Sequence, residues 1–373
     1  MDTTVDLDTF SSLVERPDES ARRAAEERWQ QLDKPRAGLG QLEELGSWLA
    51  SVQGRSPVQP LTAAKVLLFA GDHGVAGLGI SRPGSPGTAQ RVQAVLDGTA
   101  PVAVLARRYG AEVRVVDMAV DAVPGTFPAE VEYQRVRRGS GRIDIENALS
   151  LDEAARAFRT GMAVADEEAD AGTDVVVLGD LGAGSTTVAA VLIGALCGTD
   201  AAAVTGRGSG IDDRVWMVKC ATVRDALRRA RPVLGDQLAL LAAVGGADFA
   251  AVTGFLLQSA VRKLPVVLDG VVSAACALVA QRVAFRAPEW WRAGQSTGEP
   301  AQAKAYDRLT LTPLQELGVS MGEGVGALLA LPLLQAATDT LADPADAAMI
   351  TRVGLAPKEP PRLPTAAELL GRG

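Results

Sequence analysis

Val175-Val176-Val177-Leu178-Gly179-Asp180-Leu181-Gly182-Ala183-Gly184-Ser185-Thr186-Thr187 is the segment from which the fold class can be predicted. Its first four residues form a β-branched, apolar run, which is typical of a buried strand in a parallel sheet. A glycine-rich turn with an acid at its head follows, and residues 188–197 are almost all small or apolar. The sequence therefore predicts a strand, a tight turn and a packed helix, the repeating unit of α/β proteins.

The turn in this unit is a candidate anion site. Free N–H groups in the first turn of a helix point at a ligand placed before it, and glycines let that ligand approach the backbone. The hydroxyls of Ser185, Thr186 and Thr187 add donors and can cap the helix. We interpret residues 182–187 as a phosphate cradle with the carboxylate of Asp180 beside it. The alternative is a tight strand-to-helix turn that holds no ligand.

Two common nucleotide motifs are excluded by the same residues. Gly179 to Gly184 has the spacing of a Walker loop, but Ser185 stands where that motif needs lysine. The stretch is not G-x-G-x-x-G either, and no acid stands in the usual place on a following strand. A nucleoside triphosphate with magnesium is therefore disfavoured, and so is a Rossmann-type NAD-dependent oxidoreductase.

Composition narrows the remaining classes. The 373 residues are 47% hydrophobic but only 4% aromatic, with 39 glycines, which suits helices packed closely on a parallel sheet. The net charge of −8 and the dispersed basic residues argue against a nucleic-acid partner. His73 is the only histidine and the three cysteines lie far apart, so the usual zinc arrangements are excluded. We predict no metal and no cofactor.

Targeting signals also bear on the class of protein. The N-terminus carries early acids and lacks the basic-then-apolar pattern of a secretory signal. No apolar run reaches about 18 residues, the length typical of a membrane helix. We expect a cytoplasmic protein with no membrane association.

The remaining chain alternates between strand and helix patterns. We predict a mostly parallel, Rossmann-like sheet with helices on both faces, plus a small helical subdomain. Residues 1–60 form an N-terminal helical segment of that subdomain, 61–340 the α/β domain, and 341–373 a helical and proline-rich tail. Residues 286–309 are expected to be rich in loops, with Trp290 and Trp291 covering apolar surface. Expected strands lie at 65–70, 112–120, 175–178, 201–204 and 264–270, and expected helices include 18–29, 41–51, 88–96, 100–109, 151–169 and 271–283.

Glycine turns gather at the predicted strand ends. Parallel sheets bind ligands at the carboxyl ends of their strands. Several such turns on one edge predict a pocket there more strongly than any one of them. The turns are Gly71-Asp72, Gly179-Asp180, Gly206-Arg207, Gly245-Gly246 and Asp269-Gly270.

Four side chains are candidates for chemistry. Glu323 lies between two glycines before an apolar helix, where a ligand can approach its carboxylate, so it is a candidate general base. The alternative for Glu323 is a first-turn acid that complements the helix dipole. Asp180 could hold ribose hydroxyls or stabilise positive charge, or backbone N–H groups could satisfy it. Lys219 could contact a phosphate, although a solvated helix lysine is the commoner case, and His73 is more typical of a structural histidine.

Six segments together resemble one known family. They are Phe69-Ala-Gly-Asp-His-Gly-Val-Ala76, the 179–187 turn, Gly206-Arg-Gly-Ser-Gly-Ile-Asp-Asp213 with Lys219, Ala243-Val-Gly-Gly246, Pro265-Val-Val-Leu-Asp-Gly270 and Met321-Gly-Glu-Gly-Val-Gly326. In this order they resemble the nicotinate-nucleotide–dimethylbenzimidazole phosphoribosyltransferases. The resemblance covers roughly residues 20–340, and the combination is far more specific than any single motif.

The resemblance implies a pentosyltransferase of cobalamin lower-ligand synthesis. It implies transfer of phosphoribose from nicotinate mononucleotide to 5,6-dimethylbenzimidazole or a related base, with Glu323 as catalytic base and Asp180 near the ribose. It also implies a homodimer and a base pocket that includes Ser81 and Gln90. The matching nucleotide-binding residues are Gly182, Gly184, Ser185, Thr186, Thr187, Gly206, Arg207, Gly208, Ser209, Gly210 and Lys219.

Three positions depart from the family pattern. Asp180 stands where the family usually has glutamate, Gln295-Ser296-Thr297 replaces its His-Arg-Ser, and Ala37-Gly38 replaces its Gly-Ser. The altered 295–297 segment favours a second hypothesis, a non-catalytic paralogue that binds a nucleotide or base as a sensor. The retained Glu323 favours the enzyme.

Overall fold

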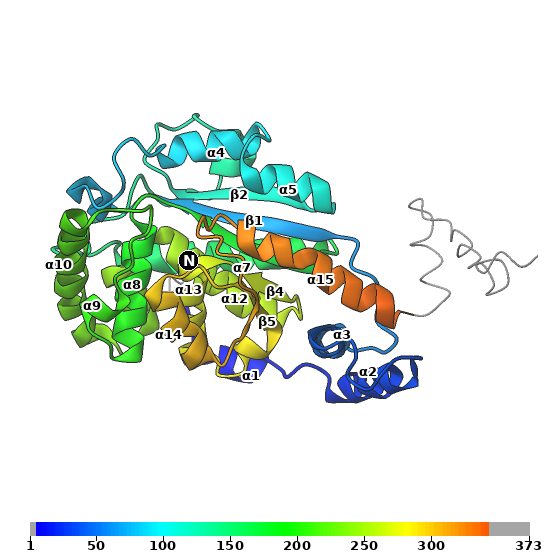
Figure 1. Ribbon diagram of the computed structural model, residues 1–373. Coiled ribbons are helices and arrows are strands. Elements are labelled where there is room, and N and C mark those ends of the chain that lie inside the picture. The colour runs from blue at the N-terminus through cyan, green and yellow to red at the C-terminus, as the bar shows by residue number, and fades with distance from the viewer. Residues whose placement is uncertain (1–4, 343–373) are drawn as a thin grey trace, which may run out of the picture.

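A single six-stranded sheet organises the chain. The computed structural model describes residues 5–342, in which all strand pairs are parallel and the strand order is β2-β1-β3-β4-β5-β6 (Figure 1). This confirms the predicted parallel α/β sheet. The strands are β1 (Ala64–Gly71), β2 (Glu112–Ala119), β3 (Val175–Leu181), β4 (Val266–Leu268), β5 (Trp291–Gln295) and β6 (Pro313–Gln315).

Helices cover both faces of the sheet. On one face lie α4 (Thr88–Leu96), α5 (Pro101–Tyr109) and α15 (Val325–Leu341), and on the other lie α7 (Leu151–Asp170), α12 (Ala247–Val261) and α13 (Gly270–Val283) (Figure 1). Such double cover explains why Val175 to Leu178 in β3 are wholly buried. Around α13 and beyond pack α8 (Ser185–Cys197), α9 (Ala201–Val204), α10 (Asp213–Ala230), α11 (Gln237–Val244) and α14 (Pro300–Leu309). Shorter elements are α1 (Phe10–Leu13), α6 (Ala129–Glu132), η1 (Gly74–Leu78), η2 (Arg231–Val233) and η3 (Ala287–Trp290).

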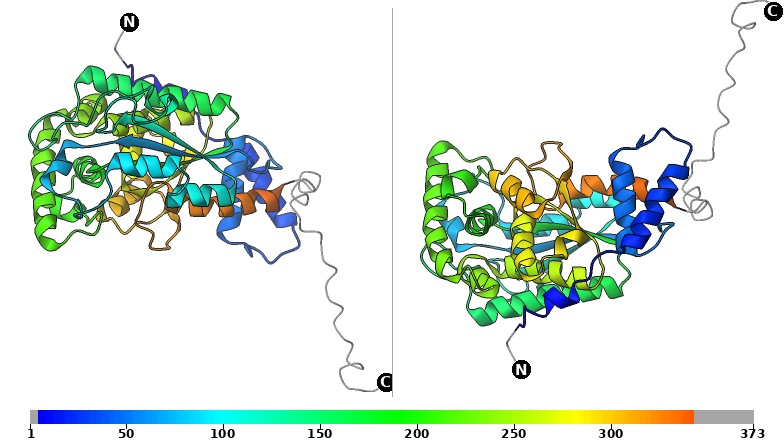
Figure 2. Two further views of the ribbon diagram at one scale, coloured as in Figure 1. Left: turned by 90° about the horizontal axis from the view of Figure 1, so that it is seen from above. Right: turned by 90° about the horizontal axis from the view of Figure 1, so that it is seen from below.

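The N-terminal helices form a small cluster at one end of the molecule. In α2 (Glu19–Gln31), Asp18 caps the first turn by accepting the N–H groups of Ser20 and Ala21, as its position before the helix predicts. Trp29 packs with α3 (Gln41–Gln53) and with Leu341 at the end of α15. Figure 2 shows these helices beside the end of α15, away from α10. Most of the predicted 341–373 tail lies outside the described residues.

Two predicted turns do not follow strands. Residues 201–204 form the short helix α9, because the Asp200 side chain accepts the N–H of Ala203 and caps a helical turn there. Gly245-Gly246 likewise follows the helix α11. The predicted strand at 201–204 was wrong, because a four-residue apolar run carries no reliable period. The strand-end turns are therefore those at Gly71-Asp72, Gly179-Asp180 and Asp269-Gly270.

The segment 286–309 is more regular than its polar composition predicts. It contains η3, β5 and α14, and the side chains of Trp290 and Trp291 are core residues rather than a surface cover. The sequence Trp-Arg-Ala-Gly-Gln does not alternate between apolar and polar residues, so it gives no local signal of a strand. The strand forms because it pairs with β4. The loop-rich expectation was wrong because tertiary pairing overrides weak local propensity.

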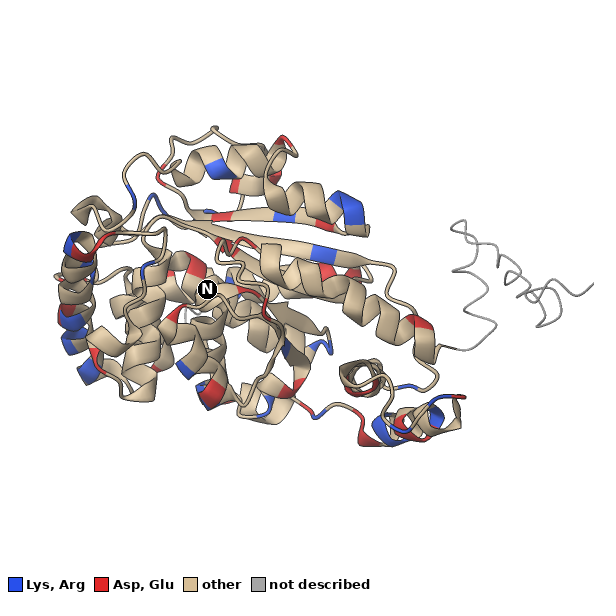
Figure 3. Ribbon diagram, viewed as in Figure 1, with Lys and Arg blue, Asp and Glu red and all other residues tan. Residues whose placement is uncertain are grey.

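The strand order fixes where a ligand crevice belongs. From β1 the chain passes to β2 on one side and returns to β3 on the other, which makes the carboxyl ends of β1 and β3 a topological switch point. Figure 3 shows acidic and basic residues interspersed over the outer elements in that view. Within residues 5–342, no helix is long and apolar enough to cross a membrane.

Candidate functional site at the carboxyl ends of the strands

Asp180 and Glu323 lie next to each other at the switch point. Asp180 is near the end of β3, and its Oδ2 accepts a hydrogen bond of 3.1 Å from the hydroxyl of Ser185 at the start of α8. A Cβ placed on Gly322 would lie 3.8 Å from Asp180 Oδ1, so the Glu323 turn passes directly over this carboxyl. The sequence predicted both acids at this edge, and the structure brings them together.

The Glu323 turn has an unusual backbone. Three successive residues have positive φ angles: Gly322 at 69°, Glu323 at 61° and Gly324 at 79°. For a residue with a Cβ this conformation costs about 1–2 kcal/mol, and such strain gathers at functional sites. Gly324 is the N-cap of α15, so Glu323 precedes the helix and is not the first-turn acid of the dipole alternative. Its side chain is only 5% exposed.

Gly179 supports this turn from below. A Cβ at Gly179 would lie 2.2 Å from the backbone nitrogen of Gly324 and 2.6 Å from the carbonyl carbon of Glu323. Only a residue without a side chain lets the 322–324 turn rest on β3. The glycine that ends the β-branched run is therefore what brings the Glu323 carboxylate over the strand end.

We expect Gly179→Ala to lower the catalytic turnover by a factor of about 10² or more, because a displacement of a positioned catalytic group by about 1 Å can lower the rate by that factor. The measurement is the steady-state rate, with circular dichroism to check the fold. Gly235→Ala is the matched control, since a Cβ there meets no atom within 4 Å. Parent-like turnover in Gly179→Ala would mean that the turn adapts and that Gly179 does not position Glu323.

Arg91 is a functional residue that the sequence analysis missed. From α4, its Nε donates to Glu323 Oε1 at 2.8 Å, and its Nη2 donates to the same oxygen. Gln90, the neighbouring residue predicted for the base pocket, is exposed, and its Oε1 accepts the N–H of Gly87 at 3.2 Å, capping α4. The sequence analysis missed Arg91 because its partner Glu323 lies far away along the chain.

Lys219, which the family resemblance assigns to the nucleotide site, is a buried lysine. It lies on α10 with 1% of its surface exposed, so the alternative of a solvated helix lysine does not apply. Its Nζ donates to Thr186 Oγ1 at 3.0 Å, and burial lowers its pKa, an effect that Glu299 opposes. An ammonium has three donors, and burying it without an anion is costly. The arrangement is suited to receive an anionic group between α8 and α10.

The 206–210 turn closes around this lysine. A Cβ on Gly208 would lie 3.1 Å from Lys219 Nζ, and the Gly208 N–H donates to Glu299 Oε1 at 2.8 Å. The hydroxyl of Ser209 accepts the N–H of Arg82 at 2.8 Å, which joins this turn to the loop that contains Ser81. The structure thus brings the two glycine turns, Lys219 and the Ser81 loop together, although the second turn follows a helix.

Arg207 and Gly184 make structural contacts with nearby residues. Arg207 donates to Ile211 O and Asp213, and its side chain is 56% exposed, so it braces the turn from outside. Gly184, with φ 88°, is the N-cap of α8, and a Cβ there would lie 3.2 Å from His73 Cβ. The Gly182–Thr187 turn therefore packs against the loop after β1.

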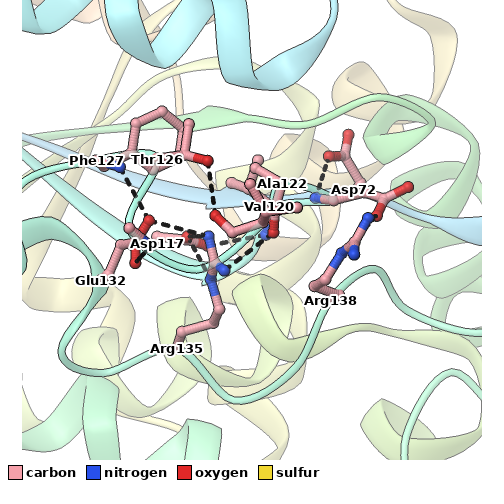
Figure 4. Close-up of polar contacts among 12 residues, drawn as sticks. Asp72, Asp117, Val120, Ala122, Thr126, Phe127, Glu132, Arg135 and Arg138 are labelled. Atoms are coloured by element: carbon pink, nitrogen blue, oxygen red, sulfur yellow. Dashed lines mark hydrogen bonds and ion pairs between the residues drawn. The ribbon is translucent and has the colours of Figure 1, made fainter.

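The loop after β1 is braced by polar contacts. Asp72 Oδ1 accepts a hydrogen bond from the Thr88 hydroxyl at 2.5 Å. Its Oδ2 accepts the N–H of Asp121 at 2.7 Å (Figure 4). Beside it, Arg135 pairs with the buried Asp117 of β2. These contacts hold together the ends of β1 and β2, beside the switch point between β1 and β3.

His73 is a buried, paired histidine, as its lone occurrence suggests. Its Nε2 lies 3.2 Å from Asp248 Oδ2, and its ring packs edge-on against Phe249. Burial lowers the pKa of His73, but Asp248 outweighs this effect and leaves the pKa raised. The imidazole anchors the loop against α12.

A further buried acid, Asp269, follows β4. Its Oδ1 accepts from Gln295 Nε2 and from the Ala327 N–H, both at 3.2 Å. Burial raises the pKa of Asp269 to about 6, although these hydrogen bonds oppose the rise. Gln295 is wholly buried, so the residue that opens the altered 295–297 segment belongs to this internal network. The Thr297 hydroxyl donates a hydrogen bond to Oε1 of Gln302 on α14.

Burial also sets the protonation of Asp180. Desolvation raises the pKa of Asp180 from 3.8 to about 7, against the lowering effect of Arg91. The folded protein therefore binds this proton more tightly than the unfolded chain does. Stability from Asp180 is fully present below about pH 4 and is lost as pH rises towards 7.

Asp180→Asn should accordingly stabilise the fold at pH 8, where the parent carries a desolvated charge, and change little at pH 4. The gain is on the order of a few kcal/mol at most. Thermal melts of both proteins at the two pH values measure it. A variant that is less stable than the parent at pH 8 would show that the carboxylate is well satisfied in its ionised form.

A family model described as Phosphoribosyltransferase matches residues 14–349. The chain belongs to this family. It is 64% identical over 342 residues to the nicotinate-nucleotide–dimethylbenzimidazole phosphoribosyltransferase of Streptomyces avermitilis, covering 91% of each chain. The protein of the same name from Mycobacterium tuberculosis is 48% identical over 328 residues, with 88% of this chain and 90% of that one covered.

Solved structures agree with this phosphoribosyltransferase membership. The crystal structure of CobT from Thermus thermophilus superposes with a TM-score of 0.81 at 35% identity. The match covers 86% of this chain and 96% of that one. The family resemblance carried by the six motifs is therefore confirmed, and the fold is the fold of these transferases.

Proposed function

We propose that the chain transfers the phosphoribosyl group of nicotinate mononucleotide to 5,6-dimethylbenzimidazole or a related base. The products are α-ribazole 5′-phosphate and nicotinate, a step of cobalamin lower-ligand synthesis. The observation that carries the proposal is the placement of the Glu323 turn over Asp180 at the switch point, with the buried ammonium of Lys219 bonded to Thr186 in the turn that follows Asp180. The names of the relatives supply the substrates.

The leaving group explains why few catalytic side chains are needed. In nicotinate mononucleotide the departing ring is a pyridinium, so its nitrogen takes the bond electrons and leaves neutral, without a general acid. The acceptor nitrogen attacks the opposite face of the sugar carbon, which inverts the β configuration to α. The benzimidazole must also lose the proton on its other nitrogen. One carboxylate base is sufficient for that transfer.

The residues divide into three roles. Glu323 accepts the acceptor's N–H proton, and its glycine neighbours leave room for the planar base. Asp180 stabilises the oxocarbenium-like sugar electrostatically, since a preorganised charge facing developing positive charge favours the transition state. Lys219 and Thr186, joined at 3.0 Å, receive the 5′-phosphate together with the 206–210 turn. Ser81 and the exposed Gln90 belong to the acceptor side.

We extend the proposal to the assembly and the domains. The chain acts as a homodimer in the cytoplasm. Residues 61–340 form the transferase domain and residues 1–60 contribute to the small helical subdomain.

One incubation tests the proposed function. Purified protein is mixed with nicotinate mononucleotide and dimethylbenzimidazole, and products are identified by mass and chromatography. We expect α-ribazole 5′-phosphate and nicotinate in equal amounts, and neither without the acceptor. Tight binding of both substrates without product would favour the non-catalytic paralogue, and no binding would contradict both hypotheses.

A further inference from the structure

The contact between Arg91 and Glu323 is one-sided. Both Nε and Nη2 of the guanidinium donate to Oε1, and the hydrogen bonds found within residues 5–342 leave Oε2 unengaged. The Glu323 side chain is 5% exposed, while Arg91 is 29% exposed and approaches from the solvent side. Arginine frequently binds both oxygens of a carboxylate. Here both hydrogen bonds go to Oε1, so Oε2 remains available.

The charges around Glu323 make this contact important. Asp180 of β3 and Asp269 after β4 lie close enough to interact, and burial raises the pKa values of both. Arg91 of α4 brings a positive charge to these acids, and it lowers the pKa of Asp180 against the effect of desolvation. Like charges disfavour an ionised carboxylate and a nearby cation favours it. Arg91 therefore places a positive charge against Glu323 and close to Asp180.

We propose that Arg91 is the positioning residue of the general base. It holds Glu323 by Oε1 and presents Oε2 to the N–H of the acceptor base, on the nitrogen that does not attack the sugar. This inference rests on the proposed function. In the reaction, the acceptor proton passes to Oε2 while the new N–C bond forms, and the glycosidic bond electrons leave with the pyridine nitrogen. Arg91 touches neither substrate in this step.

The two properties that Arg91 supplies, charge and a planar fork, are separable. Arg91→Met removes both and keeps most of the apolar stem. Arg91→Lys restores the charge but not the fork, since an ammonium is a point donor on a flexible stem. Arg228→Met is the matched control, because Arg228 lies on α10 with its side chain 65% exposed and pairs with Asp225.

The test is a pH–rate profile of the parent and these variants with nicotinate mononucleotide and dimethylbenzimidazole. For Arg91→Met we expect kcat to fall about tenfold or more across the pH range, because the carboxylate is no longer held in one orientation. The KM for nicotinate mononucleotide should stay within about twofold, because Arg91 holds the base and not the nucleotide. Arg91→Lys should not restore kcat, because an ammonium does not hold the carboxylate as the planar fork does, and Arg228→Met should match the parent.

Two further comparisons keep the outcome clear. Because burial raises the pKa of Asp180 to about 7, the effect of Arg91→Met on kcat is also measured in an Asp180→Asn background. An unchanged kcat in both backgrounds, or a raised KM with unchanged kcat, overturns the positioning role while leaving the transferase intact. A parent protein that makes no product overturns the proposed function itself, and this inference with it.

Discussion

Glu323→Gln is expected to bind both substrates and to lose turnover by about 10²–10⁴, the usual range for removal of a general base. Glutamine keeps the size of the side chain and an oxygen for Arg91, so the 322–324 turn should persist. What it cannot do is take a proton. Steady-state rates, with calorimetric affinities for each substrate, measure the two effects separately.

The companion variant makes this result specific. Asp180→Asn should cost less, because its proposed role is electrostatic and does not involve proton transfer. An acidic limb caused by Glu323 should vanish in Glu323→Gln, and a limb near pH 7 that persists there belongs to Asp180, whose pKa burial raises to about 7. A Glu323→Gln protein with near-parent turnover, beside an inactive Asp180→Asn, would reverse the two assignments.

The second large effect concerns Lys219. Lys219→Met keeps the length of the stem and removes the ammonium, and a hydrogen bond to a charged group contributes about 1.5–3 kcal/mol. We expect affinity for nicotinate mononucleotide to fall roughly 10- to 150-fold. Without ligand, the variant should melt higher than the parent, because a buried charge with a lowered pKa has been removed.

Lower nucleotide affinity together with a higher melting temperature would distinguish a ligand-binding lysine from a structural one. A lysine that only supports the fold would lose stability on replacement and leave nucleotide affinity alone. Lys304→Met on α14 is the control, as Lys304 is only partly buried. Unchanged affinity in Lys219→Met, measured by calorimetry, would remove the phosphate from this part of the crevice.

Much of the fold was predictable because its signals are local. The β-branched run of β3, the Asp18 cap and the alanine-rich α7 all carry their patterns in neighbouring residues. Glu323 was also predictable, because the glycines that give it room stand on either side of it. The strand assigned to residues 201–204 failed for the opposite reason, since a short alanine run is compatible with either structure.

Long-range pairings could not be predicted in the same way. Arg91 and Glu323 are 232 positions apart, and neither segment contains a local pattern that predicts their contact. The burial of Lys219 had a local signal that went unused. Lys219 shares a helical face with Thr222, Val223 and Ala226, at spacings of three, four and seven residues, and all are buried. A lysine on an apolar face predicts a buried charge, and a buried charge predicts an anion.

The anomeric configuration of the product shows directly whether phosphoribosyl transfer at Glu323 and Asp180 inverts the sugar carbon. Nicotinate mononucleotide and dimethylbenzimidazole are converted by the parent protein, and proton NMR follows the anomeric signal and free nicotinate. We expect one equivalent of nicotinate for each α-ribazole 5′-phosphate formed, and almost none with Glu323→Gln. A β-configured product, or α product formed at the parent rate by Glu323→Gln, would rule out the proposed inverting, Glu323-catalysed transfer.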